Sequence, residues 1–275
     1  MNSGALDDRD PDFIRRHLRG FERLIDAWFA PEVDGLERVP DGRALIVGTH
    51  NGGNMAPDML CLMAAFWRRF GPERPAYGLA HDQVFRVPML GRLLSRLGAV
   101  PAGQERARAL LERDATVLVY PGGDVDAFKP FRERHTVKFG GRTGFVRTAL
   151  ATGAPIVPVV SVGAHETVRV LGDGRGLARA LGLKRWTRIE VLPVMLCLPW
   201  GVFLGPLEGH LPMPSKIRLR VLPPMKLAHP PSAAGDDALV RALAEQVRST
   251  MQAALDELAR EPHGVRARLD ELLRP

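Results

Sequence analysis

Short apolar runs alternate with helix-prone segments along most of this chain. The run over residues 44–47, Ala-Leu-Ile-Val, ends at Gly48, and the helix-prone segment 59–66 follows it. Two β-branched apolar runs, over residues 116–120 and 155–162, are each preceded by a helix-prone segment. Strands that alternate with helices usually pair in parallel. The pattern therefore predicts an α/β fold with a mixed, partly parallel central sheet flanked by helices.

The other expected elements complete this architecture. We expect strands over 76–80 and, at a sheet edge, over 217–222, and helices over 88–97, 105–113, 143–152 and 238–258. A chain of 275 residues favours one mixed domain with helical additions. We divide it into an N-terminal amphipathic helical region over 1–35, a central domain over 36–230 and a C-terminal helical extension over 231–275.

The two cysteines indicate a reducing compartment. Cys61 and Cys197 both lie in apolar runs, which is typical of reduced core thiols and not of a disulfide or a metal site. Residues 1–12 are mostly polar and acidic, unlike a secretory signal. We therefore expect exposure to the cytoplasm and no bound metal.

The chain is strongly basic. Its formal net charge is +7, its pI is near 10.1, and arginine far outnumbers lysine. Such a balance suits nucleic acid, an anionic membrane or an anionic substrate. Aromatic residues make up only 6% and no zinc-finger or RNA-binding signature occurs, which argues against nucleic acid. A membrane surface and an anionic substrate remain as partners.

Two segments could contact a membrane. Apolar residues recur at helical spacing over residues 13–29 with arginines mostly between them, which predicts a basic amphipathic helix. The same pattern suits a helix packed on its own domain. Residues 191–207 form an uncharged apolar run that prolines interrupt, so a buried or membrane-surface segment is favoured over a crossing. We expect a peripheral or monotopic protein on the cytoplasmic face of the membrane.

His50 and Asp58 flank the turn that follows the first apolar run. A histidine at a strand end and an aspartate at the next helix start can meet in space. The imidazole then serves as a general base, and the carboxylate fixes its tautomer and stabilises its cation. The alternative is a loop histidine followed by an aspartate that merely suits the helix dipole. The glycine pair Gly52-Gly53 permits the tight turn between them.

Other enzyme templates are absent from the sequence. It contains no G-x-S-x-G, P-loop or H-E-x-x-H motif. His81, His135 and His165-Glu166 are possible site residues, but surface or structural roles are favoured for all of them.

Four segments, taken in order, resemble the motif blocks of the glycerolipid and phospholipid acyltransferase superfamily, the 1-acylglycerol-3-phosphate acyltransferase-like proteins. The pair His50…Asp58 resembles the His-x4-Asp motif. The segment Phe85-x2-Pro88-x2-Gly91, continuing to residue 100, is similar to the second block.

The third and fourth blocks complete the resemblance. Residues 120–126 read Tyr-Pro-Gly-Gly-Asp-Val-Asp, which looks like the Phe-Pro-Glu-Gly block with Asp126 at a glutamate position. Residues 142–166, from Arg-Thr-Gly-Phe to Gly-x2-Glu, are closest to the diacylglycerol acyltransferase type 2-like branch. The resemblance covers roughly residues 33–166.

This resemblance implies an enzyme of lipid metabolism whose acyltransferase domain spans 36–230. It would transfer a fatty acyl group from acyl-CoA or acyl carrier protein to a hydroxyl of a glycerolipid, without a further cofactor. The catalytic residues would be His50 and Asp58. The substrate-binding positions would be Asn51, Gly52, Gly53, Gly122, Gly123, Asp126, Arg132 and Arg142.

Two departures from the family pattern bear on the mechanism and the acceptor. Asp58 lies eight residues after His50 instead of five, with a glycine-containing insertion between them. The third block reads Pro-Gly-Gly, and the carboxylates of Asp124 and Asp126 close behind it would repel a phosphate. Arginines 92 and 96 could still bind one. On balance a neutral acceptor such as diacylglycerol is favoured.

Three alternatives stay open at this point. The protein could be a lysophosphatidate or lysophospholipid acyltransferase. It could be a lipid-ester hydrolase that activates water with the same histidine. It could also be a non-catalytic, membrane-surface lipid-binding protein that keeps the fold.

Overall fold

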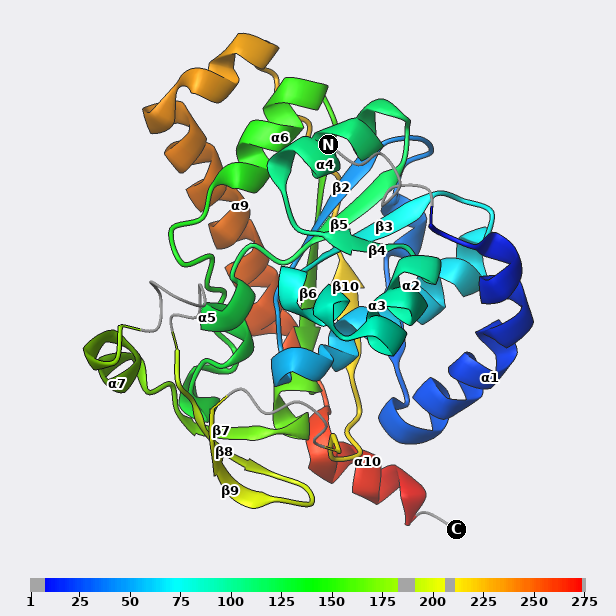
Figure 1. Cartoon of the computed structure of the whole chain (residues 1–275), viewed down its shortest axis with the longest axis vertical. Coiled ribbons are helices and arrows are strands. Elements are labelled where there is room, and N and C mark those ends of the chain that lie inside the picture. Colours follow the sequence, from blue (N-terminus) through cyan, green and yellow to red (C-terminus); the bar gives the residue numbers. More distant parts are fainter. Residues whose placement is uncertain (1–7, 183–190, 206–210, 274–275) are drawn as a thin grey trace.

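A seven-stranded sheet forms the centre of the protein. The computed structural model describes residues 8–182, 191–205 and 211–273 (Figure 1). The strand order is β1-β10-β6-β2-β5-β3-β4. All neighbours from β6 to β4 run parallel, whereas β10 is antiparallel to β6 and β1 is parallel to β10. The predicted α/β fold with a mixed, partly parallel sheet is confirmed.

The strands of this sheet coincide closely with the apolar runs of the sequence. They are β1 (Glu32–Asp34), β2 (Ala44–Gly48), β3 (Ala76–Ala80), β4 (Ala99–Pro101), β5 (Thr116–Val119), β6 (Ile156–Val162) and β10 (Arg218–Val221). A strand does form near residues 217–222, but the prediction that it lies at the edge of the sheet was wrong. β10 lies second from the edge because the short acidic strand β1 pairs with it.

Helices cover the sheet and its ends. The α-helices are α1 (Pro11–Phe29), α2 (Pro57–Phe70), α3 (Pro88–Arg96), α4 (Gln104–Glu112), α5 (Gly123–Ala127), α6 (Gly144–Thr152), α7 (Arg175–Ala180), α9 (Asp237–Leu258) and α10 (Gly264–Leu272). Short 3-10 helices are η2 (Leu36–Arg38), η3 (Gly53–Met55), η4 (Asp82–Arg86), η5 (Phe131–Glu133), η6 (Ala164–Thr167) and η7 (Pro231–Gly235).

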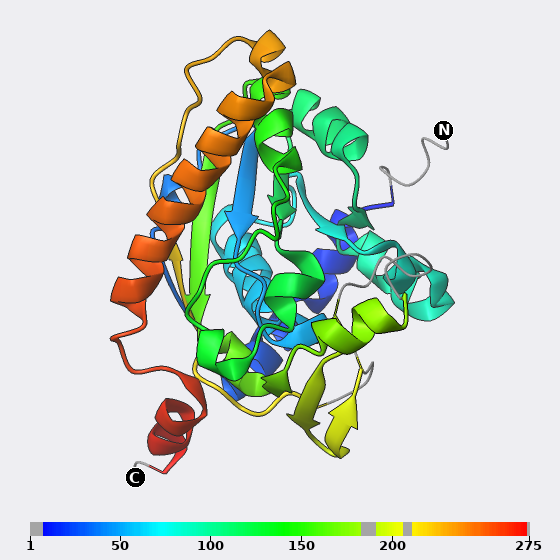
Figure 2. The same cartoon turned by 90° about the vertical axis from the view of Figure 1, so that its left-hand side faces the viewer.

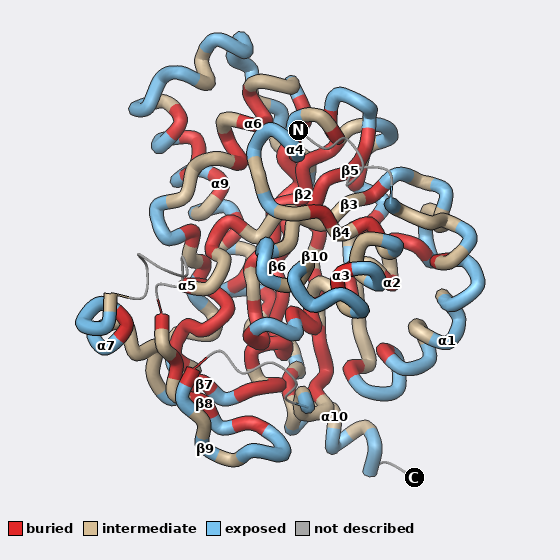
Figure 3. The backbone as a smooth tube through the Cα atoms, in the orientation of Figure 1, coloured by how far each residue is buried: buried red, intermediate tan, exposed pale blue. Residues whose placement is uncertain are grey.

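Strand alternation divides the core between the two faces of the sheet. In β2, Leu45 and Val47 belong to the cluster formed with α4, α6 and α9. The alternating residues Ala44 and Ile46 belong to the cluster formed with α1 and α2. Since both faces are covered, β2 is buried throughout, as its uninterrupted apolar sequence predicts. Figure 2 shows α9 along the sheet, and Figure 3 shows the buried strands at the centre.

The terminal helices share this core. Asp10 caps α1 by accepting a hydrogen bond from the backbone N–H of Phe13, and Ile14, Ile25 and Phe29 are buried against the domain. The apolar face of the predicted amphipathic helix is therefore largely packed on its own domain. The N-terminal region expected over 1–35 contains α1 but also the strand β1, and the C-terminal extension expected over 231–275 contains α9 and α10. Residues 1–7 and 274–275 of these regions lie outside the described residues. Both regions supply core residues.

A second, smaller sheet carries the apolar segment expected over residues 191–207. It contains β7 (Arg169–Gly172), β8 (Val194–Cys197) and β9 (Gly201–Leu204), all antiparallel. Residues 206–207 lie outside the described part of the chain. Alternation again sorts the side chains, because Met195 is buried while Leu196 and Val202, paired across the two strands, are exposed. None of the helices in the described ranges combines the length and hydropathy of a bilayer crossing.

Candidate active site

The candidate site lies at the carboxyl ends of three neighbouring parallel strands. β2 leads into His50, β5 leads into Tyr120 and the glycine pair after it, and β6 ends just beyond Ser161. In parallel sheets these ends meet at one edge, where ligands usually bind. The first, third and fourth blocks of the sequence are thus brought together by the order of the central strands β6-β2-β5.

His50 is held in place through its backbone. Its N–H donates to Oδ2 of Asp126 at 2.7 Å. The imidazole Nδ1 is buried without a hydrogen-bond partner among the described residues, and the ring lies 5.2 Å from that of Tyr120, centroid to centroid. Burial, with a smaller contribution from the charge of Lys129, lowers the pKa of His50 to about 4. The ring is therefore neutral near pH 7, which is the form a general base requires.

Asp58 is buried in the first turn of α2. Its Oδ2 accepts hydrogen bonds from Ser161 Oγ at 2.9 Å and from Asn51 Nδ2 at 3.3 Å, and its Oδ1 accepts one from Met59 N at 2.9 Å. Its exposed fraction is only 1%. Burial outweighs these hydrogen bonds and raises the pKa of Asp58 to about 7. Strongly displaced pKa values in a cluster of polar groups are typical of functional sites.

The structure brings His50 and Asp58 to the same turn but joins them indirectly. Within residues 8–182, 191–205 and 211–273, the hydrogen bonds of the Asp58 carboxylate come from Ser161, Asn51 and Met59, and none comes from the imidazole. Asn51, the neighbour of His50, connects the two. Catalytic hydrogen bonds are often long or misaligned before substrate binds, so this geometry is compatible with a pair that closes on binding.

The glycine pair makes the lengthened turn possible. Gly52 has φ +80° and Gly53 has φ +65°, both in the left-handed region. A Cβ atom on Gly52 would lie 2.6 Å from Pro57 Cδ and 2.7 Å from the carbonyl oxygen of Ala164. The expectation that these glycines accommodate the insertion is therefore supported. Asn51 is buried, so its contacts are with the protein core instead of an open surface.

The third block forms a close turn beside His50. Gly123 has φ +49°, and its N–H donates to the carbonyl of Tyr120 at 3.1 Å. A Cβ atom on Gly122 would lie 2.1 Å from the carbonyl oxygen of Lys138. The Gly123 amide is therefore engaged and is not a free donor for an oxyanion.

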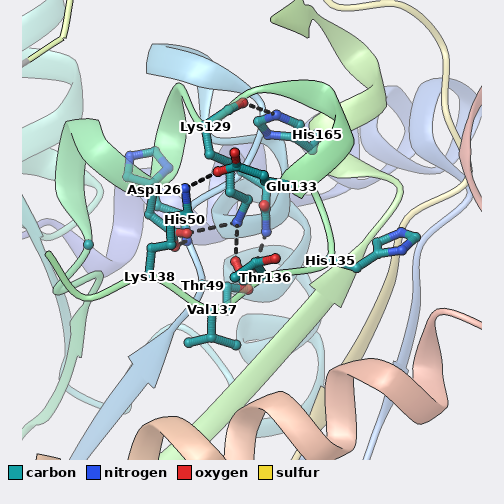
Figure 4. A network of polar contacts seen from close by, with 12 residues as sticks. Thr49, His50, Asp126, Lys129, Glu133, His135, Thr136, Val137, Lys138 and His165 are labelled. Carbon is teal, nitrogen blue, oxygen red and sulfur yellow. Dashed lines mark hydrogen bonds and ion pairs between the residues drawn. The ribbon is translucent and has the colours of Figure 1, made fainter. Parts of the chain in front are cut away.

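Asp126 is a supporting residue buried behind this turn. It forms an ion pair with Lys129, Nζ to Oδ1, at 2.7 Å, and both side chains are essentially inaccessible. Burial raises the pKa of Asp126, and the charge of Lys129 opposes that shift. The carbonyl of Lys129 lies 2.7 Å from Nε2 of His165 (Figure 4). Asp126 therefore fixes the backbone of His50 and is not placed to touch substrate directly.

The two predicted arginines lie in different surroundings. Arg142 donates to Asp124 Oδ1 at 2.9 Å and also to the carbonyl oxygen of Gly122, so it lies at the third block as expected. The Arg132 side chain is 80% exposed, and its ion pair is with the adjacent Glu133 at 3.5 Å. Among the described residues, Arg132 forms no hydrogen bond or ion pair with the other predicted site residues.

Several supporting residues were missed from the sequence. Ser161 is the hydroxyl residue in the otherwise apolar strand β6, which was a usable signal for a buried polar contact. Lys129 lies three residues after Asp126, a spacing that brings two side chains together on a helical turn. Tyr120 was read only as part of a motif, although its ring contacts His50.

Comparison with known proteins decides the family. A family model described as Acyltransferase matches residues 30–162. A protein of Mycobacterium tuberculosis described as uncharacterized is 35% identical over 252 residues, which cover 90% of this chain and 67% of that protein. The chain belongs to the acyltransferase family.

Other relatives of this acyltransferase agree with the assignment. A mouse protein named "DGAT1/2-independent enzyme synthesizing storage lipids" is 26% identical over 242 residues, covering 88% of this chain and 64% of that protein. The crystal structure of the 1-acyl-sn-glycerophosphate (LPA) acyltransferase, PlsC, from Thermotoga maritima superposes with a TM-score of 0.55 at 17% identity, covering 92% of this chain and 85% of that one. At this low identity, the match to the Thermotoga maritima structure shows similarity of fold alone. The acyltransferase spans about two thirds of the length of the mycobacterial and mouse relatives.

Proposed function

We propose that this acyltransferase moves a fatty acyl group from acyl-CoA or acyl carrier protein to a hydroxyl of a glycerolipid, without a further cofactor. The observation that carries the proposal is the position of His50. It lies at the carboxyl end of β2, neutral near pH 7, with a buried ring nitrogen that has no partner in the described structure.

The reaction needs a base, an attack and a proton return. His50 takes the proton of the acceptor hydroxyl as its oxygen attacks the thioester carbonyl carbon. The carbonyl oxygen gains negative charge in the tetrahedral intermediate, and the Gly122 amide is a candidate donor to it. The intermediate then expels the thiolate by breaking the C–S bond, and the imidazolium returns the proton to sulfur. No acyl-enzyme is required.

Asp58 is proposed to support this cycle through charge. Once Asp58 is ionised and approaches the imidazole, its charge favours the imidazolium that forms as the hydroxyl is deprotonated. Asp58 also holds Asn51 and Ser161, so it fixes the turn on one side of His50. Asp126 fixes the backbone of His50 from the other side.

We further propose a neutral acceptor such as diacylglycerol. Asp124 and Asp126 have the cationic partners Arg142 and Lys129, so they repel a phosphate less than expected from the sequence. Arg96 is also engaged, because it donates to Asp10 at 2.8 Å and its guanidinium lies 3.7 Å from the ring centroid of Phe13. An arginine engaged with α1 in this way is a poor phosphate clamp. The name of the mouse relative, which refers to storage lipids, points the same way.

The acceptor is tested by parallel assays with one acyl-CoA and either diacylglycerol or lysophosphatidate. We expect the diacylglycerol rate to be the higher. A lysophosphatidate rate about tenfold higher than the diacylglycerol rate, a difference of about 1.4 kcal/mol in the barrier, would reject the neutral acceptor. It would leave the acyl transfer proposal intact.

Membrane contact is proposed through the small sheet β7-β8-β9. Its inner face buries Met195 and Cys197, whereas Leu196, Val202 and Leu204 on the outer face are 44%, 68% and 52% exposed. A contiguous exposed apolar surface on an otherwise polar exterior marks a contact with membrane or protein. Localisation at the cytoplasmic face, as a peripheral or monotopic protein, remains our proposal.

Sedimentation with anionic liposomes tests this surface. A Val202→Glu/Leu204→Glu double variant is expected to lose most binding, because two charges would have to enter the interface. The matched control is Leu24→Glu on α1, where the leucine is 63% exposed. If Leu24→Glu abolishes binding and the sheet variant does not, then α1 is the contact.

A further inference from the structure

Three side chains suited to metal binding converge beside η6. Glu166 belongs to η6, His135 follows η5, and His263 immediately precedes α10. One ligand atom of each lies within 4.8 Å of the others. We propose that His135, Glu166 and His263 bind a divalent transition-metal ion of the zinc class, which fastens α10 to the loop after the third block.

The spacing fits tetrahedral coordination. Zinc binds imidazole nitrogen and carboxylate oxygen at about 2.0–2.2 Å, so ligand atoms on a tetrahedron lie about 3.4 Å apart. The distance from His263 Nε2 to Glu166 Oε1 is 3.5 Å. The rings of His135 and His263 have centroids 5.3 Å apart and are inclined at 71°, so both can present an edge to one ion.

The hydrogen bonds around the cluster set up its nitrogens for coordination. His263 Nδ1 lies 2.7 Å from the carbonyl oxygen of Glu261, so this nitrogen carries the proton and Nε2 keeps its lone pair. Such a second hydrogen bond typically orients a metal-binding histidine. His135 Nε2 is buried and has no hydrogen-bond partner in the described structure. Two imidazole nitrogens beside a carboxylate are therefore available as ligands.

Backbone contacts hold the carboxylate in place. Gly264 has φ +82°, and a Cβ atom there would lie 1.6 Å from Glu166 Oε2. The same oxygen accepts a hydrogen bond from Val265 N at 3.2 Å, which leaves Oε1 directed at His263. The cluster also borders a narrow crevice lined by Asn51 and Ser161, the two side chains that hold Asp58.

Arg134 is the competing cation. Its Nε lies 3.7 Å from Glu166 Oε1, beyond hydrogen-bond range, while its guanidinium rests 4.4 Å from the ring centroid of Phe131 and donates to the carbonyl of that residue at 3.2 Å. The arginine is therefore anchored elsewhere and contributes a weak ion pair. Removing the charge of Arg134 should therefore strengthen metal binding. If Glu166 instead served only as the ion-pair partner of Arg134, the cluster would bind no metal.

Metal titration distinguishes a metal site from a simple ion pair between Glu166 and Arg134. The purified full chain is treated with a chelator, dialysed and titrated with zinc chloride in a calorimeter. Cobalt(II) absorption then reports the coordination geometry. We expect one tight equivalent per chain, a tetrahedral cobalt spectrum and a thermal unfolding midpoint that rises with zinc. Glu166→Gln and His263→Ala should each weaken zinc binding by at least about tenfold.

His229→Ala, which removes an exposed histidine outside the cluster, is the matched control and should bind like the wild type. Arg134→Gln should bind zinc as tightly as the wild type or more tightly. The proposal is overturned if the wild type binds no stoichiometric zinc, or if the His263→Ala and Glu166→Gln proteins bind it unchanged. If Glu166→Gln does not fold by circular dichroism, His263→Ala decides. Acyl transfer is not measured, so failure here leaves the proposed function intact.

Discussion

Replacing His50 with alanine is expected to lower acyl transfer by about 10²–10⁴-fold, the usual contribution of a general base. The loss follows because His50, just after β2, is the group proposed to take the hydroxyl proton. His50 Nδ1 has no hydrogen-bond partner in the described structure, so the substitution breaks no ring hydrogen bond. The fold and the thermal midpoint should therefore change little.

Initial rates with labelled acyl-CoA, together with circular dichroism, check this expectation. The matched control is His81→Ala, which removes an exposed histidine that the sequence also offered as a site residue. Near wild-type turnover in a folded His50→Ala protein would contradict the mechanism. A similar loss in His81→Ala would mean that the effect is not specific to the base.

Replacing Asp58 with asparagine is expected to lower activity and raise stability. Activity should fall at least about tenfold, because a neutral amide cannot favour the imidazolium. The pKa of Asp58 is raised from 3.8 to about 7 in the folded protein. The folded state therefore holds this proton more tightly than the unfolded state. The protonated Asp58 carboxyl group therefore stabilises the folded state fully below about pH 3.8, and this stabilisation is lost as the pH rises to about 7.

Above about pH 7, burial of the charged Asp58 carboxylate lowers the free energy of unfolding by on the order of 2–4 kcal/mol. The asparagine variant has no such charge, so its stability should fall less than that of the wild type between pH 5 and pH 8. Guanidinium unfolding at both pH values measures the difference. The control is Asp41→Asn, whose carboxylate is fully exposed and pairs with Arg74 only at 3.8 Å. An unchanged pH dependence in Asp58→Asn would show that this carboxylate is not strained by burial.

If Asp58→Asn retains full activity, another carboxylate must support His50. Asp124 is the next to test, because its charge acts on the imidazole and opposes the lowering of its pKa. Asp126 touches the backbone of His50 and not the ring. Its removal would also leave the buried Lys129 charge unpaired, at a cost of about 3–5 kcal/mol.

The fold could be predicted from the sequence wherever apolar runs were long enough to be buried on both faces. β2, β5 and β6 were found for that reason, and α2, α3, α4 and α6 were found from their helical spacing, whereas the short helix α5 was missed. β1 and β4 were missed because each has only three residues, and β1 contains two acids. Their pairing is decided by neighbours that are distant in the chain, which local patterns do not record.

The sequence indicated which candidate residues lie at the strand ends, but not their contacts. His50, Asp58 and the glycine turns lie where they were expected because strand ends and helix starts have strong local signals. The role of Asn51 as a link to Asp58, and of Asp126 as a support for the His50 backbone, required the meeting of β2, β5 and β6 in space. The same limit hid the cluster of His135, Glu166 and His263, whose members come from three separate segments.

The fate of the acyl group shows whether His50 drives acyl transfer to a glycerolipid. Wild-type protein and the His50→Ala variant are incubated with labelled acyl-CoA, with and without diacylglycerol. We expect label in the acylated glycerolipid, matched by free CoA, only when acceptor and His50 are both present. Label released as free fatty acid without acceptor would indicate a hydrolase. Equal incorporation by the variant would rule out His50 as the base.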